Sequence, residues 1–349
     1  MKAILWYNNS DIRLVDLPLR QPGPREILVK VISCGLCGSD VVEWYRLPRA
    51  PFVPGHEIGA EVVEVGQEIS RFKPGSRVFL APKVPCGYCY YCRHGHQPQC
   101  SEVKERLPGG LAEYILVPEV IVEGGTYLLP DNVTFDESTF IEPLACVIRS
   151  QRLSGIEKGQ IVLVLGSGVS GLLQLQLAKN KECRVAITDV VEKKLLLAKE
   201  MGADLTLPAT DNILEKMLLF FGKKADVVVL CTSSLEAIDQ AWACLDKGGT
   251  MVFFAVPGPE KKVNFPINAF WTQEIKIITS YYCGPADIEE AIKLISERKI
   301  EVNRLISHRL PLEETARGYQ LILAGEALKV IINPSLKVTR TQKLKFSKK

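Results

Sequence analysis

The spacing of hydrophobic residues changes along the chain near residue 140. Before that point, short runs rich in Val and Ile are bounded by Gly and Pro, which is typical of β-strands. The runs that predict strands cover residues 26–33, 58–65, 77–81 and 112–117. The first part of the chain is therefore expected to be mostly β-structure.

From residue 160 onward, continuous apolar runs alternate with segments of helical spacing. Fully apolar strands separated by helices are typical of a parallel sheet covered on both faces. The expected strands are 160–165, 183–188, 225–230 and 250–255, and the helices between them are 169–180, 192–201 and 235–245. Two more helices, 287–298 and 313–324, and a strand at 329–332 complete an α/β pattern.

The composition is that of an ordinary globular chain of about two domains. Hydrophobic residues make up 47% and charged residues 24% of the 349 positions, and one domain takes roughly 150 residues. No run of about 18 apolar residues predicts a membrane helix, and the apolar run after Met1 is too short for a signal peptide. We expect a cytoplasmic protein without membrane contact.

The net charge of +3 comes from the C-terminal tail. Residues 335–349 carry six Lys or Arg and no acid, whereas the rest of the chain has 37 basic and 40 acidic side chains. Such a tail is expected to be solvated and disordered. The rest of the chain shows no excess of basic residues that would predict nucleic-acid binding.

Four of the eleven cysteines stand close together. Cys86, Cys89, Cys92 and Cys100 have the spacing C-x2-C-x2-C-x7-C, so that one loop presents four thiolates to a single ion. Zinc favours such a tetrahedron of sulfur, and four protein ligands make the site structural. An iron–sulfur cluster and a cluster without metal are the alternatives. The odd number of cysteines, without a secretion signal, argues against a disulfide framework.

A glycine-rich turn, GSGVSG at residues 166–171, joins an expected strand to an expected helix. It lets a pyrophosphate approach the helix N-terminus, where free N–H groups favour negative charge. Asp189 ends the next strand; its carboxylate would bind ribose hydroxyls and repel a 2′-phosphate, so NAD is expected rather than NADP. The cofactor-binding candidates are Gly166, Gly168, Val169, Ser170, Gly171, Asp189 and Lys194. The alternatives are a turn used only for packing and, for Lys194, a solvated helix lysine.

Three dispersed motifs supply a second set of metal ligands. They are Cys37-Gly38-Ser39-Asp40, Gly55-His56-Glu57 and Glu142-Pro143. Together they offer one thiolate, one imidazole and two carboxylates, the ligand types of a catalytic zinc that keeps an open position. Each motif alone is weak evidence, because a single Cys or His is more often a core or surface residue.

With these constellations in this order, the chain resembles the zinc-containing medium-chain alcohol dehydrogenases, in particular the sorbitol (polyol) and threonine dehydrogenase branch. The resemblance spans residues 1–333 and rests on GLCGSD at 35–40, GHE at 55–57, the four-cysteine loop, GGLAEY at 109–114, EPLA at 142–145 and the glycine-rich turn. It implies a GroES-like β-barrel catalytic domain at 1–148 and 284–334 and a Rossmann NAD-binding domain with a doubly wound parallel sheet at 149–283. It also implies a homodimer or homotetramer, with residues 250–255 as a candidate edge strand.

The resemblance implies roles for single residues. Cys37, His56 and Glu57 match the ligands of the catalytic zinc, Glu142 matches a carboxylate that binds the metal or the substrate, and Ser39 matches the hydroxyl that starts the proton relay. The implied reaction is reversible oxidation of a secondary alcohol or polyol, or of a sugar or amino-alcohol derivative, by hydride transfer to NAD, with two zinc ions per chain. The alternatives are a lyase or epimerase that uses NAD transiently and a non-catalytic relative.

The sequence departs from the family pattern near the expected site. Val42 stands where a histidine is usual, which leaves the proton-exit route open, and Glu43 is a candidate acceptor in its place. Arg149 also replaces a histidine, and it either meets an anionic substrate or forms a structural pair. Only 18 residues separate Cys37 from His56, several fewer than is usual in the family.

Overall fold

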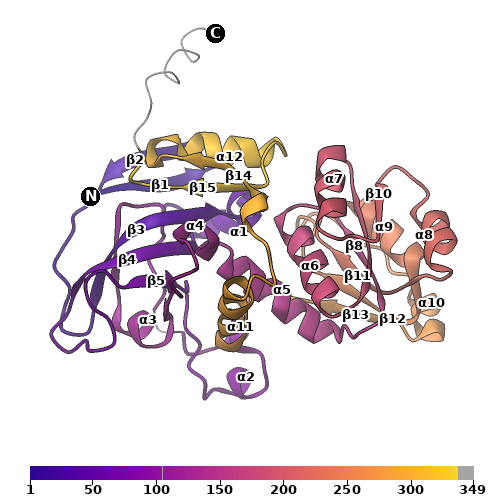
Figure 1. Ribbon diagram of the computed structural model, residues 1–349, viewed down its shortest axis with the longest axis horizontal. Coiled ribbons are helices and arrows are strands. Elements are labelled where there is room, and N and C mark those ends of the chain that lie inside the picture. Colours follow the sequence, from indigo (N-terminus) through magenta and orange to yellow (C-terminus); the bar gives the residue numbers. More distant parts are fainter. Residues whose placement is uncertain (104, 337–349) are drawn as a thin grey trace, which may run out of the picture. The chain divides into compact units, whose positions relative to one another are not determined.

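The computed structural model describes residues 1–103 and 105–336. The chain forms two compact units (Figure 1). Unit 1 combines Met1–Glu142 with the chain from Val302 onward, and unit 2 is Pro143–Glu301. The prediction about the basic tail concerns residues that lie almost entirely outside the described part.

Unit 1 is built on a seven-stranded, mostly antiparallel sheet. Its strands follow the order β14-β15-β3-β4-β5-β7, and β6 also pairs with β3. The bounds are β3 Ile27–Leu36, β4 Glu57–Val65, β5 Arg77–Leu80, β6 Tyr114–Val117, β7 Thr126–Leu128, β14 Ile306–Leu310 and β15 Lys329–Ile332. A hairpin of β1 (Lys2–Asn8) and β2 (Asp11–Asp16) forms a separate two-stranded sheet. Because β15 pairs with β3, the C-terminal segment rejoins the N-terminal sheet.

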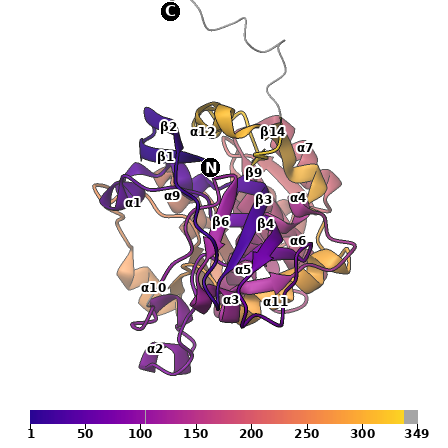
Figure 2. The same cartoon turned by 90° about the vertical axis from the view of Figure 1, so that its left-hand side faces the viewer.

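The helices of unit 1 are short and surround this sheet. They are η1 Gly38–Val41, α1 Glu43–Arg46, η2 Leu47–Arg49, α2 Tyr90–Arg93, η3 Gln97–Gln99, α3 Glu119–Gly124, α4 Phe135–Ser138, η4 Asn303–Leu305, η5 Leu312–Glu314 and α12 Thr315–Leu323. Alternate residues of the central strands, such as Val29, Val31 and Ile58, form a single buried core. Figure 2 shows α2, which carries part of the four-cysteine loop, set apart from strands β3 and β4.

Unit 2 contains a six-stranded parallel sheet with the order β10-β9-β8-β11-β12-β13. The bounds are β8 Ile161–Leu165, β9 Arg184–Asp189, β10 Leu205–Pro208, β11 Ala225–Leu230, β12 Leu245–Phe253 and β13 Lys276–Thr279. Counted from β8, this is the strand order 3-2-1-4-5-6 of a Rossmann sheet. The predicted doubly wound α/β fold is therefore confirmed.

The helices of unit 2 cover both faces of its sheet. They are α5 Ile141–Ser154, which begins in unit 1, α6 Val169–Asn180, α7 Glu192–Glu200, α8 Ile213–Phe221, α9 Leu235–Cys244, α10 Ile267–Gln273 and α11 Pro285–Ser296. Every residue of β8 is fully buried, and Leu163 on one face packs in a cluster with Met217 of α8 and Ile238 of α9. Within the described part of the chain, no helix is long and apolar enough to span a bilayer.

Unit 2 differs from the expectations in several details. Residues 250–255 are not an edge, because β12 lies between β11 and β13. Strands β10 and β13 and helices α8 and α10 were not foreseen. Helix α11, expected in the catalytic domain, packs within unit 2. Its Asp287 accepts a hydrogen bond from Arg152 on α5 (2.8 Å), and Gln176 on α6 accepts one from the Glu301 backbone N–H (2.7 Å). The chain therefore leaves this unit after Glu301 rather than after residue 283.

Candidate functional site

The ends of β3 and β4 bring two of the dispersed motifs together. Cys37 directly follows β3 and His56 directly precedes β4, and the antiparallel register sets Gly35 opposite Glu57. The Cys37 Sγ atom and one ligand atom each of His56 and Glu57 consequently lie within 4.8 Å of one another. Position 35 requires glycine, because a Cβ there would collide with the Glu57 carboxylate.

Asp40 connects the backbone of Cys37 to the ring of His56. Its Oδ2 accepts the Cys37 N–H (3.0 Å), and its Oδ1 lies 3.4 Å from His56 Nδ1. Burial alone would lower the pKa of His56, but the Asp40 carboxylate holds it well above its ordinary value. Burial would raise the pKa of Asp40, yet His56 and then Arg46 hold it below the ordinary value. A carboxylate on the far side of an imidazole is the usual support of a metal-binding histidine.

Lys329 is a buried cation at this site that sequence reasoning missed. It begins β15, is 2% exposed and donates a hydrogen bond from Nζ to Glu57 Oε2. The other oxygen, Glu57 Oε1, is buried and has no hydrogen-bond partner among the described residues. A buried acceptor without a donor is costly, and a metal ion held with Cys37 and His56 would satisfy it. The donor set therefore fits a zinc ion with three protein ligands.

The sequence carries only a faint signal for Lys329. Its strand reads KVII, and all four residues are buried. A lysine at the first position of a strand looks like a solvated end, because nothing nearby in the sequence shows that β15 pairs with β3 beside Glu57.

The structure shows what Ser39 and Glu43 contact. Ser39 Oγ donates to Cys37 Sγ (3.3 Å) and accepts a hydrogen bond from Arg46 Nη2 (2.7 Å). Glu43 Oε1 accepts the backbone N–H of Asn9, in the turn of the β1–β2 hairpin, at 2.8 Å. Glu43 thus supports that turn. Besides Cys37, the Ser39 hydroxyl contacts Arg46, a residue that no sequence motif indicated.

Helix α5 carries two further residues that the sequence singled out. Glu142 lies in its first turn and is 5% exposed, but its carboxylate does not join Cys37, His56 and Glu57 in one ligand group of the described chain. Arg149, two turns later, is also buried, and burial lowers the pKa of its guanidinium.

The four-cysteine loop brings its four sulfurs close together. Cys86 and Cys92 have their Sγ atoms 3.9 Å apart, as do Cys89 and Cys100, and all four lie within 4.8 Å of one another. A tetrahedron with Zn–S bonds of about 2.3 Å places its sulfurs roughly 3.8 Å apart, whereas a disulfide needs about 2.05 Å. The backbone N–H of Cys86 points at Cys100 Sγ (3.3 Å) and that of Cys89 at Cys86 Sγ (3.3 Å), which stabilises thiolates. The four sulfurs therefore fit one structural zinc.

The glycine-rich turn lies where β8 gives way to α6. Gly166 has a φ of +100°, which favours glycine, and a Cβ on Gly171 would collide with the Gly166 carbonyl oxygen. Around Gly168, the N-cap of α6, a Cβ would meet nothing within 4 Å. Gly166 and Gly171 thus allow the turn, and Gly168 leaves open space beside the N–H groups of Val169 and Ser170 at the start of α6. This fits a cradle for a pyrophosphate.

Asp189 ends β9 and contacts this turn. Its Oδ2 accepts the backbone N–H (2.7 Å) and the hydroxyl (2.9 Å) of Ser167, and its Oδ1 accepts the backbone N–H of Val191 (2.9 Å). Ser167 was not among the candidates, although it fixes the carboxylate. Lys194 lies half-buried in the first turn of α7, two residues beyond Glu192.

Comparisons with known proteins cover nearly the whole chain. Residues 23–124 match the family described as alcohol dehydrogenase GroES-like domain, and residues 170–297 match the family described as zinc-binding dehydrogenase. A sorbitol dehydrogenase of Ovis aries is 32% identical over 347 residues, 95% of each chain. One of Halalkalibacterium halodurans is 31% identical over 349 residues, 96% of this chain and 99% of the relative.

Solved structures agree with the fold. A zinc-binding dehydrogenase of Sinorhizobium meliloti 1021, bound to NADP, has a TM-score of 0.85 and 30% identity over 95% of this chain and 99% of its own. Galactitol-1-phosphate dehydrogenase of Escherichia coli has a TM-score of 0.82 and 24% identity, over 96% and 100% of the two chains, and at that identity it supports the fold alone.

Proposed function

Because the chain belongs to the zinc-containing alcohol dehydrogenase family, in its sorbitol-dehydrogenase-like branch, we propose that it oxidises a secondary alcohol or polyol reversibly to a ketone. NAD⁺ takes the hydride, and one proton is released. The observation that carries the proposal is the cluster of Cys37, His56 and Glu57, in which the buried Glu57 Oε1 lacks a donor.

In this proposal unit 1 is the catalytic domain. Zinc would be held by Cys37, His56 and Glu57, and when bound it supplies Lewis-acid polarisation of the substrate hydroxyl. Asp40 orients His56, and Lys329 donates a hydrogen bond that fixes the buried Glu57 carboxylate in place. Ser39 Oγ offers a hydrogen-bonding hydroxyl beside the sulfur of Cys37. Glu142 stays a candidate for contact with the metal or the substrate.

Unit 2 would bind the cofactor. The turn formed by Gly166, Gly168 and Gly171 would receive the pyrophosphate at the N-terminus of α6, where Val169 and Ser170 expose their N–H groups. The Asp189 carboxylate accepts three hydrogen bonds within the chain, which leaves about one lone pair, on Oδ1, for a ribose hydroxyl; its charge would repel a 2′-phosphate, which favours NAD. Lys193 and Lys194, which follow Asp189 at the start of α7, are the cations that would instead favour a 2′-phosphate.

The cysteines favour a reducing compartment. All eleven are free thiols in the structure, and the five proposed zinc ligands among them would have to stay reduced or metal-bound for activity or stability. Such usage is typical of the cytoplasm, where we place the protein.

A substrate panel tests the reaction. Polyols, sugar acids, amino alcohols and their phosphates are offered with NAD, and NADH absorbance is recorded. We expect net NADH with at least one secondary alcohol. His56→Ala should abolish it and remove one of two bound zinc ions, while NAD binding survives. His94→Ala is the matched control and should keep both zinc ions. His94 is an exposed histidine of the four-cysteine loop, and its Nδ1 lies 2.7 Å from the Tyr90 carbonyl oxygen of the adjacent helix α2. Turnover in His56→Ala equal to wild type would contradict the proposal.

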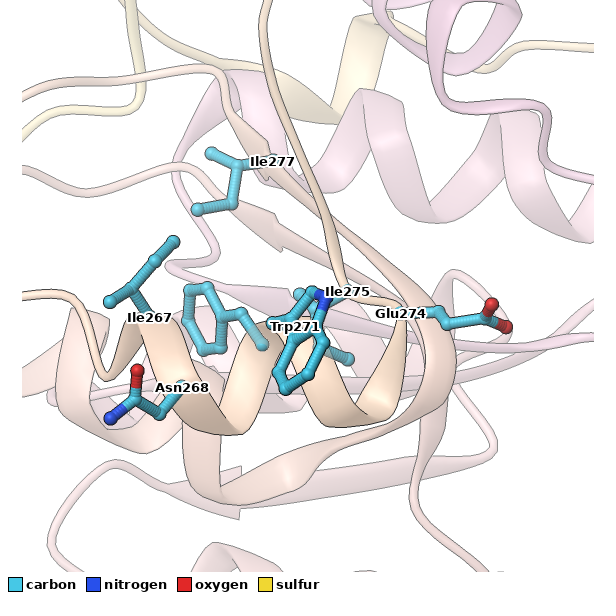
Figure 3. Close-up of a pocket in the computed structure, with 7 residues that line it drawn as sticks. Ile267, Asn268, Trp271, Glu274, Ile275 and Ile277 are labelled. Carbon is cyan, nitrogen blue, oxygen red and sulfur yellow. The ribbon is translucent and has the colours of Figure 1, made fainter.

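We also propose that two copies associate through the edge of the unit 2 sheet. Strand β13 ends that sheet in the described part of the chain, so one row of its N–H and C=O groups has no strand partner there. Beside it lies a groove lined by Ile267, Trp271 and Ile277, shown in Figure 3, whose side chains are 67%, 81% and 39% exposed. An exposed edge with large apolar residues is an association surface, and pairing of identical edges across a two-fold axis closes the assembly.

The oligomer is tested by light scattering after gel filtration. Ile277→Lys should shift the mass from dimer or tetramer toward a smaller species, because a lysine at the edge opposes strand pairing. Leu219→Lys, on the exposed surface of α8 (78% exposed), should leave the mass unchanged. A monomeric wild type, or an unchanged mass for Ile277→Lys, would refute the proposed interface.

A further inference from the structure

Arg46 ends helix α1 and is only 7% exposed, which is unusual for an arginine. Its guanidinium makes three hydrogen bonds to two residues. Nε donates to the Ser39 carbonyl oxygen (3.0 Å), and Nη2 donates to Ser39 Oγ (2.7 Å) and to Asp40 Oδ1 (2.9 Å). The guanidinium carbon lies 4.9 Å from the centre of the Tyr45 ring, which supports the group from one side. Arg46 is thus held in one orientation.

The contact with Asp40 extends the influence of Arg46 to two proposed metal ligands. Asp40 is 2% exposed, accepts the Cys37 backbone N–H and lies beside His56 Nδ1. A buried carboxylate keeps its place only while its charge is compensated. Loss of the guanidinium would leave Asp40 with His56 as its remaining cationic partner in the described chain. Both the position of Cys37 and the orientation of the imidazole depend on that carboxylate.

The contact with Ser39 restricts what its hydroxyl can do. A serine hydroxyl has one proton to donate and two lone pairs that accept. A guanidinium only donates and stays charged at accessible pH, so Ser39 must accept from Arg46 and direct its own proton elsewhere. That proton points at Cys37 Sγ (3.3 Å). Val42 is aliphatic and Glu43 bonds the backbone of Asn9, so neither provides Ser39 with a base.

We propose that Arg46 is a positioning residue, whose guanidinium fixes Ser39 as a hydrogen-bond donor toward the site and orients Cys37 and His56 through Asp40. The inference deepens the proposed function and rests on its zinc site. It also means that protons do not leave Ser39 along this side of unit 1, because Arg46 cannot accept one.

Zinc release tests the proposal without any substrate. A chromogenic chelator in excess is added to wild type, Arg46→Ala, Arg46→Lys and Arg49→Ala, and the release of each zinc is timed. Arg49 is the matched control, because it faces the same Tyr45 ring at 5.6 Å but is exposed. Outer partners of metal ligands contribute about 10- to 100-fold to metal affinity. We therefore expect one of two zinc ions to leave Arg46→Ala about 10- to 100-fold faster, and the other at the wild-type rate.

Chemical rescue separates positioning from a general effect on folding. Guanidinium chloride at a non-denaturing concentration should slow the fast release in Arg46→Ala and leave Arg49→Ala unaffected. Arg46→Lys should fall between, because one ammonium group cannot reproduce the fork that reaches both Ser39 and Asp40. If Arg46→Ala does not fold, the rate of zinc release from Arg46→Lys still tests the proposal.

Three results would overturn the inference. Unchanged release in both Arg46 variants shows that the guanidinium does not support the ligands. Faster loss of both zinc ions, with a lower melting temperature and no rescue, shows a role in folding only. A wild-type protein with a single zinc refutes the catalytic zinc site itself, and that result appears before any variant is compared.

Discussion

Replacing Lys329 with methionine tests the buried charge pair on which the Glu57 carboxylate depends. Lys329 is 2% exposed and Glu57 is fully buried, and Nζ also lies 5.0 Å from the centre of the Phe140 ring. Removing one partner of such a pair leaves an uncompensated charge in the interior and costs about 3–5 kcal/mol. We expect Lys329→Met to destabilise zinc-free unit 1 by that amount.

The assay must report on unit 1 alone, because a protein with two units does not unfold in one step. Amide hydrogen exchange in β3, β4 and β15 gives the opening free energy of this sheet. Lys30→Met is the matched control: the same substitution on β3, at a half-buried lysine, should cost less than about 0.5 kcal/mol. Adding zinc should reduce the cost of Lys329→Met, because the metal would supply a cation beside Glu57 in place of the lysine.

A double variant decides whether the cost comes from the charge pair. In Glu57→Gln/Lys329→Met no buried charge of the pair is left, so its cost should fall short of the sum of the two single costs by about 0.5–3 kcal/mol. The reasoning is refuted if the costs simply add, or if exchange in Lys329→Met matches that in Lys30→Met.

Four further substitutions have defined outcomes. Cys89→Ser should release one zinc and lower the melting temperature, because it opens the sulfur tetrahedron; two tightly held zinc ions would show that the loop is not a metal site. Asp189→Asn should narrow the preference for NAD over NADP by at least tenfold, about 1.4 kcal/mol, in kcat/KM, and an unchanged ratio would remove Asp189 from cofactor choice. Ser39→Ala should reduce kcat by about 100- to 10,000-fold. Glu43→Gln should reduce kcat less than about tenfold, because the amide oxygen of the glutamine can still accept the Asn9 N–H. Equal losses in the two variants would show that Glu43 accepts the proton that leaves Ser39.

The fold could be predicted where the hydrophobic pattern was unambiguous. Strand β8 and helix α6 form at the expected residues, because a continuous apolar run and a helical stripe meet at a glycine turn. Strand β13 was missed because Lys276–Thr279 is short and largely exposed, so no alternation marks it. The packing of α11 against α5 depends on the ion pair of Arg152 with Asp287, residues that are far apart in the sequence.

The residues of the candidate site also divide into those that the sequence predicted and those that it did not. Cys37, His56 and Glu57 were recognisable because ligand residues form short motifs next to strand ends, and a strand register then brings them together. Arg46 and Lys329 have no such pattern. Arg46 follows a mixed stretch, VVEWY at residues 41–45, and Lys329 reaches Glu57 only through the pairing of β15 with β3. Tertiary contacts of this kind are decided by the fold and leave no local trace.

The cations Lys329 and Arg46 also explain how two carboxylates stay buried close together at this site. Glu57 and Asp40 carry one negative charge each, and Lys329 and Arg46 carry one positive charge each, so the charges of these four side chains cancel. A divalent ion with a Cys37 thiolate adds one net positive charge to this balance. Since a buried surplus charge is costly, the loaded site should favour an anion at its open position. Small anions are therefore expected to compete with the alcohol, and the competition should weaken in Lys329→Met, where the surplus is removed.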